Sequence, residues 1–336
     1  MLDFLAISAL VLAALSVLFV ALLVGRRVSL ARAERRREAD VARLLPLALE
    51  LVEGERTQPP KLSRRDQVTL ASVLGSYARV LRGDARENIG AYFRGSAALR
   101  YELSALGSRR PWRRATAAYV LGDMSSSSAV PALLEALGDD SRDVRTSAAR
   151  SLGRLGAAEA VEPIVHALAG RSVPRSVAGQ ALLELGGPAL PELRRLLDDG
   201  DAPTRAIAAE LLGLIGGAAE GAMLLQGLVD ASAEVRAKAA RALGRVGAGT
   251  AAAGLRVALD DRVPFVRVAA ARALGELGDR DAVPRLLELA ADERFEVAQA
   301  GAQAVLAIDP GAVARAAAAP GAGPHLHEAA DLAAIA

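Results

Sequence analysis

Between Trp112 and Ile308 the apolar residues recur at helical spacing, and the whole pattern repeats every 30 or 31 residues. In its clearest form, an arginine is followed by alanines three and four positions later and by leucines seven and ten positions later. These positions lie on one face of a helix. A shorter apolar stripe precedes each arginine. A fixed period of this length predicts stacked pairs of helices, because one pair cannot bury its stripe alone. The repeat arginines are Arg114, Arg145, Arg175, Arg205, Arg236 and Arg267, and one further step reaches Ala298.

Prolines support the helical interpretation of the shorter stripe. Pro131, Pro163 and Pro284 each fall where the first turn of a helix is expected. A proline there removes no helical hydrogen bond, because the first N–H groups of a helix have no partner within it.

The repeat arginine falls within the apolar stripe, where an unpaired charge would be costly. An aspartate stands six positions before it in most copies, which predicts a ladder of ion pairs along the stack. We expect Arg236 to pair with Asp230, and the aspartates also to cap the second helices. The ladder is interpreted as structural, not catalytic. Its members are Arg145, Arg205, Arg236, Arg267, Asp139, Asp199, Asp230 and Asp261, and Asp292 has the same position in the last copy.

These units resemble the HEAT-like repeats of the phycobilin-lyase type, for example in Asp143-Val144-Arg145 and the Ala-Ala and Leu-Gly pairs that follow. The resemblance covers about 200 of the 336 residues and implies a right-handed α-solenoid. It implies no single activity, because the family includes lyases, hydroxylases and scaffolds. Two copies depart from the pattern, and the last is expected to be a terminal cap. The departures are Leu183 and Ala169 in the third copy and Ala298, Val305 and Leu306 in the last.

The N-terminal stretch from Phe4 to Gly25 contains no charged side chain. As a helix it would extend about 33 Å, enough to cross a bilayer core. The alternative is a cleavable signal peptide, but no basic residue precedes the run and its apolar core is too long. The arginines that follow at once predict a cytoplasmic location for the rest of the chain and an outside N-terminus, in a single-pass inner-membrane protein. They are Arg26, Arg27, Arg32, Arg35, Arg36 and Arg37. Recruitment of anionic lipid is a second role open to this cluster.

The predicted fold class is therefore all-α, an α-solenoid preceded by one transmembrane helix. Six of the ten aromatic residues lie between Tyr77 and Tyr119. We interpret them as the core of a cap that closes the solenoid, with a binding hot spot as the alternative. The expected parts are a transmembrane helix at 1–25, a basic juxtamembrane helix and linker at 26–62, a helical N-terminal cap at 63–110, the repeats at 111–309 and an Ala/Gly/Pro-rich tail at 310–336.

Candidate chemistry is sparse. The chain has no cysteine, which excludes disulfides and thiol catalysis, and only three histidines. His166 is expected on an exposed helix face. His325, His327 and Glu328 stand together in the tail, without a supporting shell for a metal. Hydroxylases of the related family carry paired His-Glu motifs within their repeats, whereas His327-Glu328 lies outside them. No phosphate loop, nucleophile elbow or zinc spacing occurs.

We therefore predict a scaffold without enzymatic activity or cofactor. The alternative is an enzyme of the phycobilin-lyase or deoxyhypusine-hydroxylase kind. A third hypothesis is binding of nucleic acid, which is not expected because residues 121–336 hold 21 basic and 28 acidic side chains.

The second helices of such solenoids line the concave face, where partners dock. Positions five and nine residues after the repeat arginine point away from the apolar stripe. They place two groups of arginines on this face, and we expect these to bind a protein partner that is acidic or membrane-associated. An ordinary solvated face is the alternative. The arginines are Arg150, Arg154, Arg241, Arg245 and Arg272.

Overall fold

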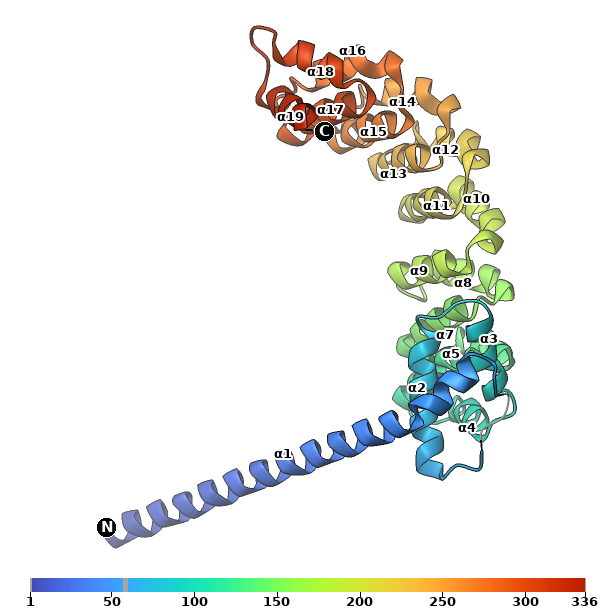
Figure 1. Cartoon of the computed structure of the whole chain (residues 1–336), viewed down its shortest axis with the longest axis vertical. Helices are drawn as coiled ribbons and strands as arrows, with labels where there is room; N and C mark the ends of the chain where they lie inside the picture. The colour runs from blue at the N-terminus through green and yellow to red at the C-terminus, as the bar shows by residue number, and fades with distance from the viewer. Residues whose placement is uncertain (1, 57–59, 336) are drawn as a thin grey trace. The chain divides into compact units, whose positions relative to one another are not determined.

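The computed structural model describes residues 2–56 and 60–335, except the side chains of residues 2–18, 20, 21, 23, 33, 64, 199 and 335. In this part of the chain all regular secondary structure is helical, as predicted (Figure 1). The chain divides into two compact units. An N-terminal unit comprises Met1–Ala105 and Asp123–Ala129, and a repeat unit comprises Leu106–Gly122 and Val130–Ala336.

The predicted transmembrane segment, residues 4–25, falls within helix α1, Leu2–Val52. Among the residues that the structure describes, no helix has both the length and the apolar character needed to span a bilayer. Most side chains of residues 4–25 lie outside that description. The anchor therefore stays a prediction from the sequence.

The N-terminal unit packs the end of α1 against α2 (Arg64–Ala78) and α3 (Asp84–Phe93), and α2 in turn contacts α4 (Ala97–Ala105). Leu44, Ala48 and Leu51 of α1 are buried in its core. The side-chain amide of Asn88 on α3 donates a hydrogen bond of 3.1 Å to the carbonyl of Val52, a helix-end acceptor that otherwise lacks a donor. The predicted boundary between residues 62 and 63 therefore lies inside this unit.

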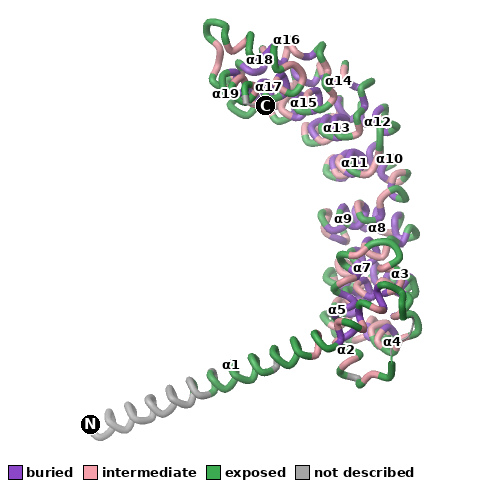
Figure 2. The backbone as a smooth tube through the Cα atoms, in the orientation of Figure 1, coloured by how far each residue is buried: buried purple, intermediate pink, exposed green. Residues whose placement is uncertain are grey.

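The repeat unit is built from pairs of helices that follow α5 (Pro111–Asp123). The first helices of the pairs form one layer and the second helices form the other, on the inner side of the curve of this unit (Figure 1). Buried residues gather where the two layers face each other (Figure 2). In order, the pairs are α6 (Val130–Ala136) and α7 (Arg142–Leu155), α8 (Val161–Ala169) and α9 (Arg175–Leu185), α10 (Leu190–Asp199) and α11 (Ala202–Ile215), α12 (Gly221–Gly227) and α13 (Ala233–Arg245), α14 (Ala252–Ala258) and α15 (Pro264–Leu277), and α16 (Val283–Leu289) and α17 (Phe295–Ile308).

The repeated residues explain these elements. Pro131, Pro163 and Pro284 lie in the first turns of α6, α8 and α16, as predicted. In two repeats the second glycine ends its helix in the left-handed conformation, which glycine adopts without strain. Gly156 after α7 and Gly278 after α15 both have φ of 68°.

The first glycine of the repeat has a different role, because it lets neighbouring second helices touch. A Cβ atom built on Gly213 of α11 would lie 2.6 Å from the Cα of Ala242 on α13. The same close approach recurs along the layer and forms a seam of small residues. Its pairs are Gly122 with Ser151, Gly153 with Ala181, Gly213 with Ala242, Gly244 with Ala273, and Gly275 with Ala304.

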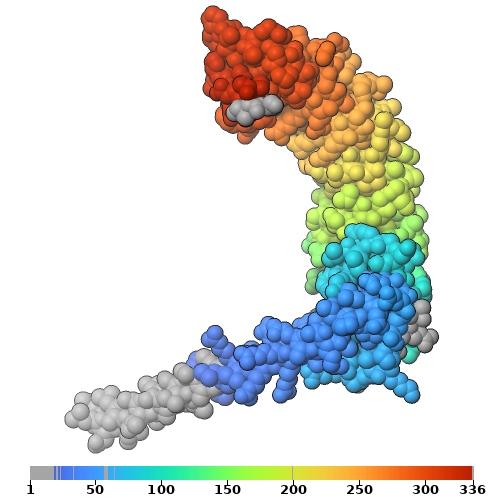
Figure 3. All heavy atoms as spheres, in the orientation of Figure 1, coloured from blue at the N-terminus to red at the C-terminus, as the bar shows by residue number. Residues whose placement is uncertain are grey.

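The seam is interrupted between α9 and α11. Leu183 and Leu211 occupy the positions that a glycine and a small residue hold elsewhere. Their bulk keeps the two helices apart, and the ribbons of α9 and α11 stand further from each other than those of α11 and α13 (Figure 1). Side chains fill the spacing, since the repeat unit is continuous on the face shown in Figure 3. We call this interruption the leucine wedge.

The C-terminal residues, predicted as an Ala/Gly/Pro-rich tail with room for a short final helix, form two helices, α18 (Pro310–Ala317) and α19 (Pro324–Ile335), which pack on α17. Asp309 begins α18 by accepting a hydrogen bond of 3.0 Å from the N–H of Ala312. Val313 and Leu326 are buried. Alanine is the strongest helix former, so this composition folds once an apolar face such as that of α17 is available.

Candidate functional site

The ladder residues connect neighbouring repeats. Nε and Nη2 of Arg236 donate hydrogen bonds of 2.6 and 3.0 Å to the carboxylate of Asp261, which lies in the next repeat. Nη1 of the same arginine donates a hydrogen bond of 2.9 Å to the main-chain carbonyl of Asp230. The predicted pairing of Arg236 with the carboxylate of Asp230 is therefore wrong. The aspartate six positions before an arginine binds that arginine through its main-chain carbonyl. The carboxylate of the same aspartate binds the arginine of the preceding repeat.

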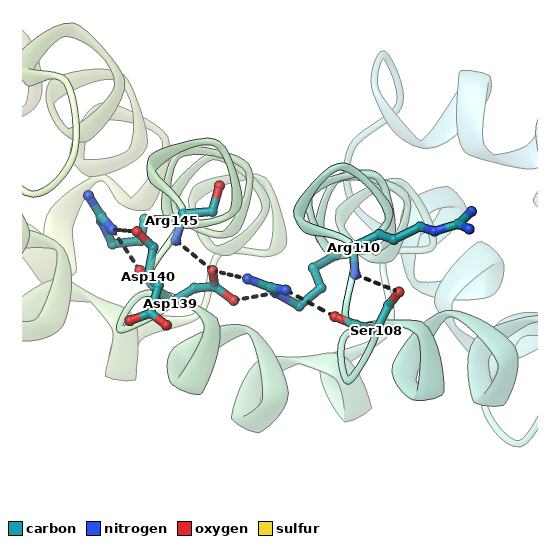
Figure 4. A network of polar contacts seen from close by, with 7 residues as sticks. Ser108, Arg110, Asp139, Asp140 and Arg145 are labelled. Atoms are coloured by element: carbon teal, nitrogen blue, oxygen red, sulfur yellow. Dashed lines mark hydrogen bonds and ion pairs between the residues drawn. The ribbon is translucent and has the colours of Figure 1, made fainter.

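The same arrangement recurs along the stack. In each case a repeat arginine pairs with the aspartate in the turn before the next second helix. Each pair joins two repeats through charge-assisted hydrogen bonds, which are stronger than neutral ones. The pairs are Arg114 with Asp139, Arg205 with Asp230, Arg236 with Asp261 and Arg267 with Asp292. Figure 4 shows the network around Asp139 and Arg145, in which Arg145 donates to the carbonyls of Asp139 and Asp140.

Two repeats on the N-terminal side of the leucine wedge depart from this arrangement. Nε of Arg145 donates a hydrogen bond of 2.9 Å to the carbonyl of Ser172, because Ala169 and Gly170 stand where an aspartate would be needed to pair with it. Arg175 makes one contact of 3.1 Å with Asp201, which also pairs with Arg171 at 2.7 Å. The side chains of Arg175 and Asp201 are 34% and 38% exposed, against 9% and 11% for Arg236 and Asp261. The side chain of Asp199, a predicted ladder member, lies outside the described residues.

The hydrogen bonds from the arginines shift the titration of the aspartates. The Arg236 guanidinium holds the pKa of the Asp261 carboxyl below its usual range, and Arg205 does the same for Asp230. Each carboxylate also accepts a hydrogen bond from the main-chain N–H two positions later, at 2.7 Å for Ser232 and 2.8 Å for Val263. These residues immediately precede their helices. The predicted capping is thus corrected to a hydrogen bond to the residue before the helix, in a turn.

The described ladder residues use their hydrogen-bonding groups within the stack. The candidate binding site therefore lies among the exposed side chains on the inner layer of second helices. Arg241 and Arg245 on α13 and Arg272 on α15 are exposed. None of the three has an ion-pair partner among the described residues, unlike the ladder arginines Arg205, Arg236 and Arg267. Close packing of Gly244 against Ala273 brings α13 and α15 together at this point. We call these three residues the C-terminal arginine group.

The other predicted partner-binding arginines lie on α7. Arg150 is exposed and has no ion-pair partner in the described part of the chain. Arg154 is half-buried, and its guanidinium lies 4.5 Å from the ring centroid of Tyr119 on α5. Its Nη2 donates a hydrogen bond of 3.1 Å to the carbonyl of Tyr119. Arg154 therefore has a positioning role within the repeat unit, and its predicted role in partner binding stays a prediction.

The helices between the two arginine groups are not basic on this face. Gln180 and Glu184 of α9 are hydrogen-bonded to each other at 3.0 Å. On α11, Glu210 forms an ion pair of 2.7 Å with Lys238 of α13. The inner layer thus presents two separate basic groups with a neutral to acidic stretch between them.

The histidines do not gather into a site. His166 is exposed, as predicted. The ring of His325 packs edge-on against Phe295 of α17 with centroids 4.6 Å apart, which gives it a role in attaching α19. Within the described residues, no three potential metal ligands of the histidine, cysteine, aspartate or glutamate type come together.

From the sequence, Trp112 and Tyr119 were predicted only as members of the aromatic cluster between Tyr77 and Tyr119. In the structure both lie on α5 with exposed side chains, at 62% and 38% exposure. Their spacing of seven positions already places them on one face of a helix. That spacing is the signal that could have singled them out.

Comparison with known proteins gives one family match. A model of HEAT repeats matches residues 102–183 and 221–307, together just over half of the 336 residues. The predicted repeats are thereby confirmed, and the interval between the two matches contains Leu211 of the leucine wedge. A search of curated proteins finds no match.

Several solved structures are similar to the chain. Human deoxyhypusine hydroxylase in complex with glycerol is 21% identical over 81% of this chain and 97% of that chain, with a TM-score of 0.32. The complex of CpcE and CpcF of phycocyanin lyase from Nostoc sp. PCC7120 is 25% identical over 44% of this chain and 98% of that chain, with a TM-score of 0.39. An engineered protein is 20% identical over 85% of this chain and 87% of that chain, with a TM-score of 0.44. TM-scores this low carry no functional conclusion.

Proposed function

We propose that this chain, which belongs to the family of HEAT-repeat proteins, is a non-enzymatic scaffold that holds an acidic protein partner on its inner layer of second helices. The observation that carries the proposal is the C-terminal arginine group. Exposed guanidinium groups without a carboxylate partner attract acidic surfaces, and arginine is enriched in protein interfaces. Neighbouring second helices lie about 8–10 Å apart, so the three side chains can address a single acidic patch.

The proposal includes a membrane anchor at residues 4–25, with the repeats on the cytoplasmic side. Its support is the uncharged run and the arginines that follow it. Arg26, Arg27, Arg32, Arg35, Arg36 and Arg37 are exposed on α1, with no ion-pair partner among the described residues. At about 100° per residue they are distributed all around the helix axis. That distribution suits a helix that leaves a bilayer through its headgroup layer, whereas a helix lying on the surface would carry its arginines on one face.

Partner capture from membranes tests the scaffold role. We expect the triple variant Arg241→Glu, Arg245→Glu and Arg272→Glu to lose capture without a change in melting temperature, because these side chains are exposed. Capture by the native chain should also weaken as salt rises. A charge-matched control reverses Arg110, Arg142 and Arg280, which are exposed at helix starts or in a loop. Equal capture by the triple variant and the control would exclude this group as the binding site.

A reporter tests the anchor. When it is fused after Ala336, it should be active in the cytoplasm. Periplasmic activity, or a mature N-terminus created by cleavage close to Ala33, would contradict the predicted topology.

A further inference from the structure

Two aromatic side chains lie on one exposed face of α5. Trp112 is 62% exposed and Tyr119 is 38% exposed. A spacing of seven positions returns to within about 20° of the same direction on a helix and advances about 10 Å along it. The pair therefore forms an elongated aromatic surface on the inner layer. Tryptophan and tyrosine are the residues most often found to dominate binding energy at protein interfaces.

Arginines of α7 extend this surface. Tyr119 and Arg150 occupy equivalent positions in successive repeats, so they are neighbours on adjacent second helices. The guanidinium of Arg154 lies over the Tyr119 ring at 4.5 Å, and its Nη2 also donates a hydrogen bond of 3.0 Å to Oγ of Ser151. A stacked guanidinium keeps its positive charge. One end of the surface is therefore basic.

The two helices that carry these residues are held rigidly together. Oγ of Ser151 on α7 donates a buried hydrogen bond of 2.8 Å to the carbonyl of Ala118 on α5. A Cβ atom built on Gly122 would lie only 2.4 Å from Oγ of Ser151, so the two helices are in close contact. Arg114 joins α5 to Asp139 through two hydrogen bonds of 2.7 Å. A surface fixed before binding requires little ordering when a ligand arrives, which favours affinity.

We propose that Trp112, Tyr119, Arg150 and Arg154 form a docking site for an extended acidic segment of a protein partner that carries an aromatic or aliphatic residue. The direction of the segment follows from Asp143, which is exposed on α7 at the position equivalent to that of Trp112. Its carboxylate repels acidic groups at that end. The apolar residue of the partner therefore packs on Trp112, and its carboxylates lie toward Arg150 and Arg154. This inference rests on the proposed function, and adds a second contact chemically distinct from the C-terminal arginine group.

Trp112 is the one tryptophan of the sequence, so its fluorescence reports on this site alone. The probe is a short synthetic peptide in which glutamates flank a phenylalanine, titrated into the purified full-length chain. Covering the exposed indole should shift its emission to shorter wavelength. Two matched peptides, with glutamines for the glutamates or alanine for the phenylalanine, should bind at least about tenfold more weakly, a difference of about 1.4 kcal/mol. Equal binding of all three peptides would overturn the proposal.

Variants locate the binding. Arg150→Glu should weaken the peptide at least about tenfold, whereas Arg280→Glu, a reversal at an exposed residue far along the chain, should not. Trp112→Ala should abolish binding of the same peptide, now carrying a fluorescent label and followed by anisotropy. Its melting temperature should not change, because the Trp112 side chain is exposed. Binding that survives both Arg150→Glu and Trp112→Ala excludes the site. If the peptide is instead lost only in the triple variant of Arg241, Arg245 and Arg272, this inference fails while the proposed function stands.

Discussion

Arg236 and Asp261 lie in successive repeats and share two hydrogen bonds, of 2.6 and 3.0 Å, with both side chains almost fully buried. A buried ion pair adds less to stability than its geometry suggests, because both ions lose their hydration. Removal of one partner is a different matter, since the other remains buried with an uncompensated charge. The pair therefore makes each repeat dependent on its neighbour.

Replacement of Arg236 by alanine should destabilise the repeat unit by about 3 kcal/mol, because the Asp261 carboxylate loses its two hydrogen bonds from the guanidinium and the carbonyl of Asp230 loses one. Chemical denaturation monitored by circular dichroism measures the change. The matched control is Arg175→Ala, whose contact with Asp201 is exposed and single, and it should cost less than about 1 kcal/mol. Similar losses for the two variants would mean that burial of the pair is unimportant.

Acid should weaken the repeat unit through the ladder. The pKa values of Asp139, Asp230 and Asp261 are lowered in the folded chain by hydrogen bonds from their arginines. A lowered folded-state pKa contributes stability that is complete above the unfolded value, about 3.9 for aspartate, and is lost as pH falls toward the folded value. The melting temperature should therefore be level between about pH 5 and 7 and fall below about pH 4. Asp230→Asn should lower the melting temperature at neutral pH and make its fall in acid shallower. If the fall in acid is unchanged, the Arg205–Asp230 pair does not contribute to it.

The seam predicts which glycines can accept a side chain. Gly213→Ala should cost about 1–3 kcal/mol, because the new methyl group would overlap Ala242 on the adjacent helix, and its backbone cannot move freely. Gly249→Ala is the control, since nothing lies within 4 Å of the position of its Cβ and its φ is not positive. That variant should stay within about 0.5 kcal/mol of the native chain. Thermal melts of the two variants compare them directly.

Local opening should concentrate at the leucine wedge. Between α9 and α11 the seam is absent, and the Arg175–Asp201 contact is exposed. Native-state hydrogen exchange at neutral pH should therefore show faster exchange for amides of α9 and α11 than for those of α13 and α15. Replacing Leu183 by glycine and Leu211 by alanine restores the residue types of the seam and should slow exchange in α11. Uniform protection across all four helices would mean that the wedge packs as firmly as the seam.

The period of the apolar residues was enough to predict the paired helices and the buried position of the repeat arginine. It could not reveal which aspartate each arginine binds. Because the repeat length is nearly constant, Asp230 stands six positions before Arg236 and also 25 positions after Arg205, and both distances recur in neighbouring repeats. The sequence pattern is thus the same for pairing within a repeat and between repeats, and only the packing of Asp261 against α13 distinguishes them.

The composition of the C-terminal residues did not predict both helices found there. The Ala/Gly/Pro content of residues 310–336 indicated a tail with at most a short final helix, although Asp309 followed by Pro310 is a signal for a helix start. That local signal was outweighed by the low complexity of the segment. The two arginine groups on the inner layer were predictable from spacing, whereas the stacking of Arg154 on Tyr119 depends on side-chain orientation.

In each of the four ladder pairs the side-chain acceptor lies on the C-terminal side of its arginine, in the repeat that follows Arg114, Arg205, Arg236 or Arg267. During synthesis every one of these arginines therefore leaves the ribosome before the carboxylate that will bind it. The C-terminal edge of each of these four repeats therefore lacks its ion-pair partner until the next repeat has emerged. The position that would follow Arg267 is Ala298. The final repeat accordingly waits for no later carboxylate, and the chain can complete its fold without one.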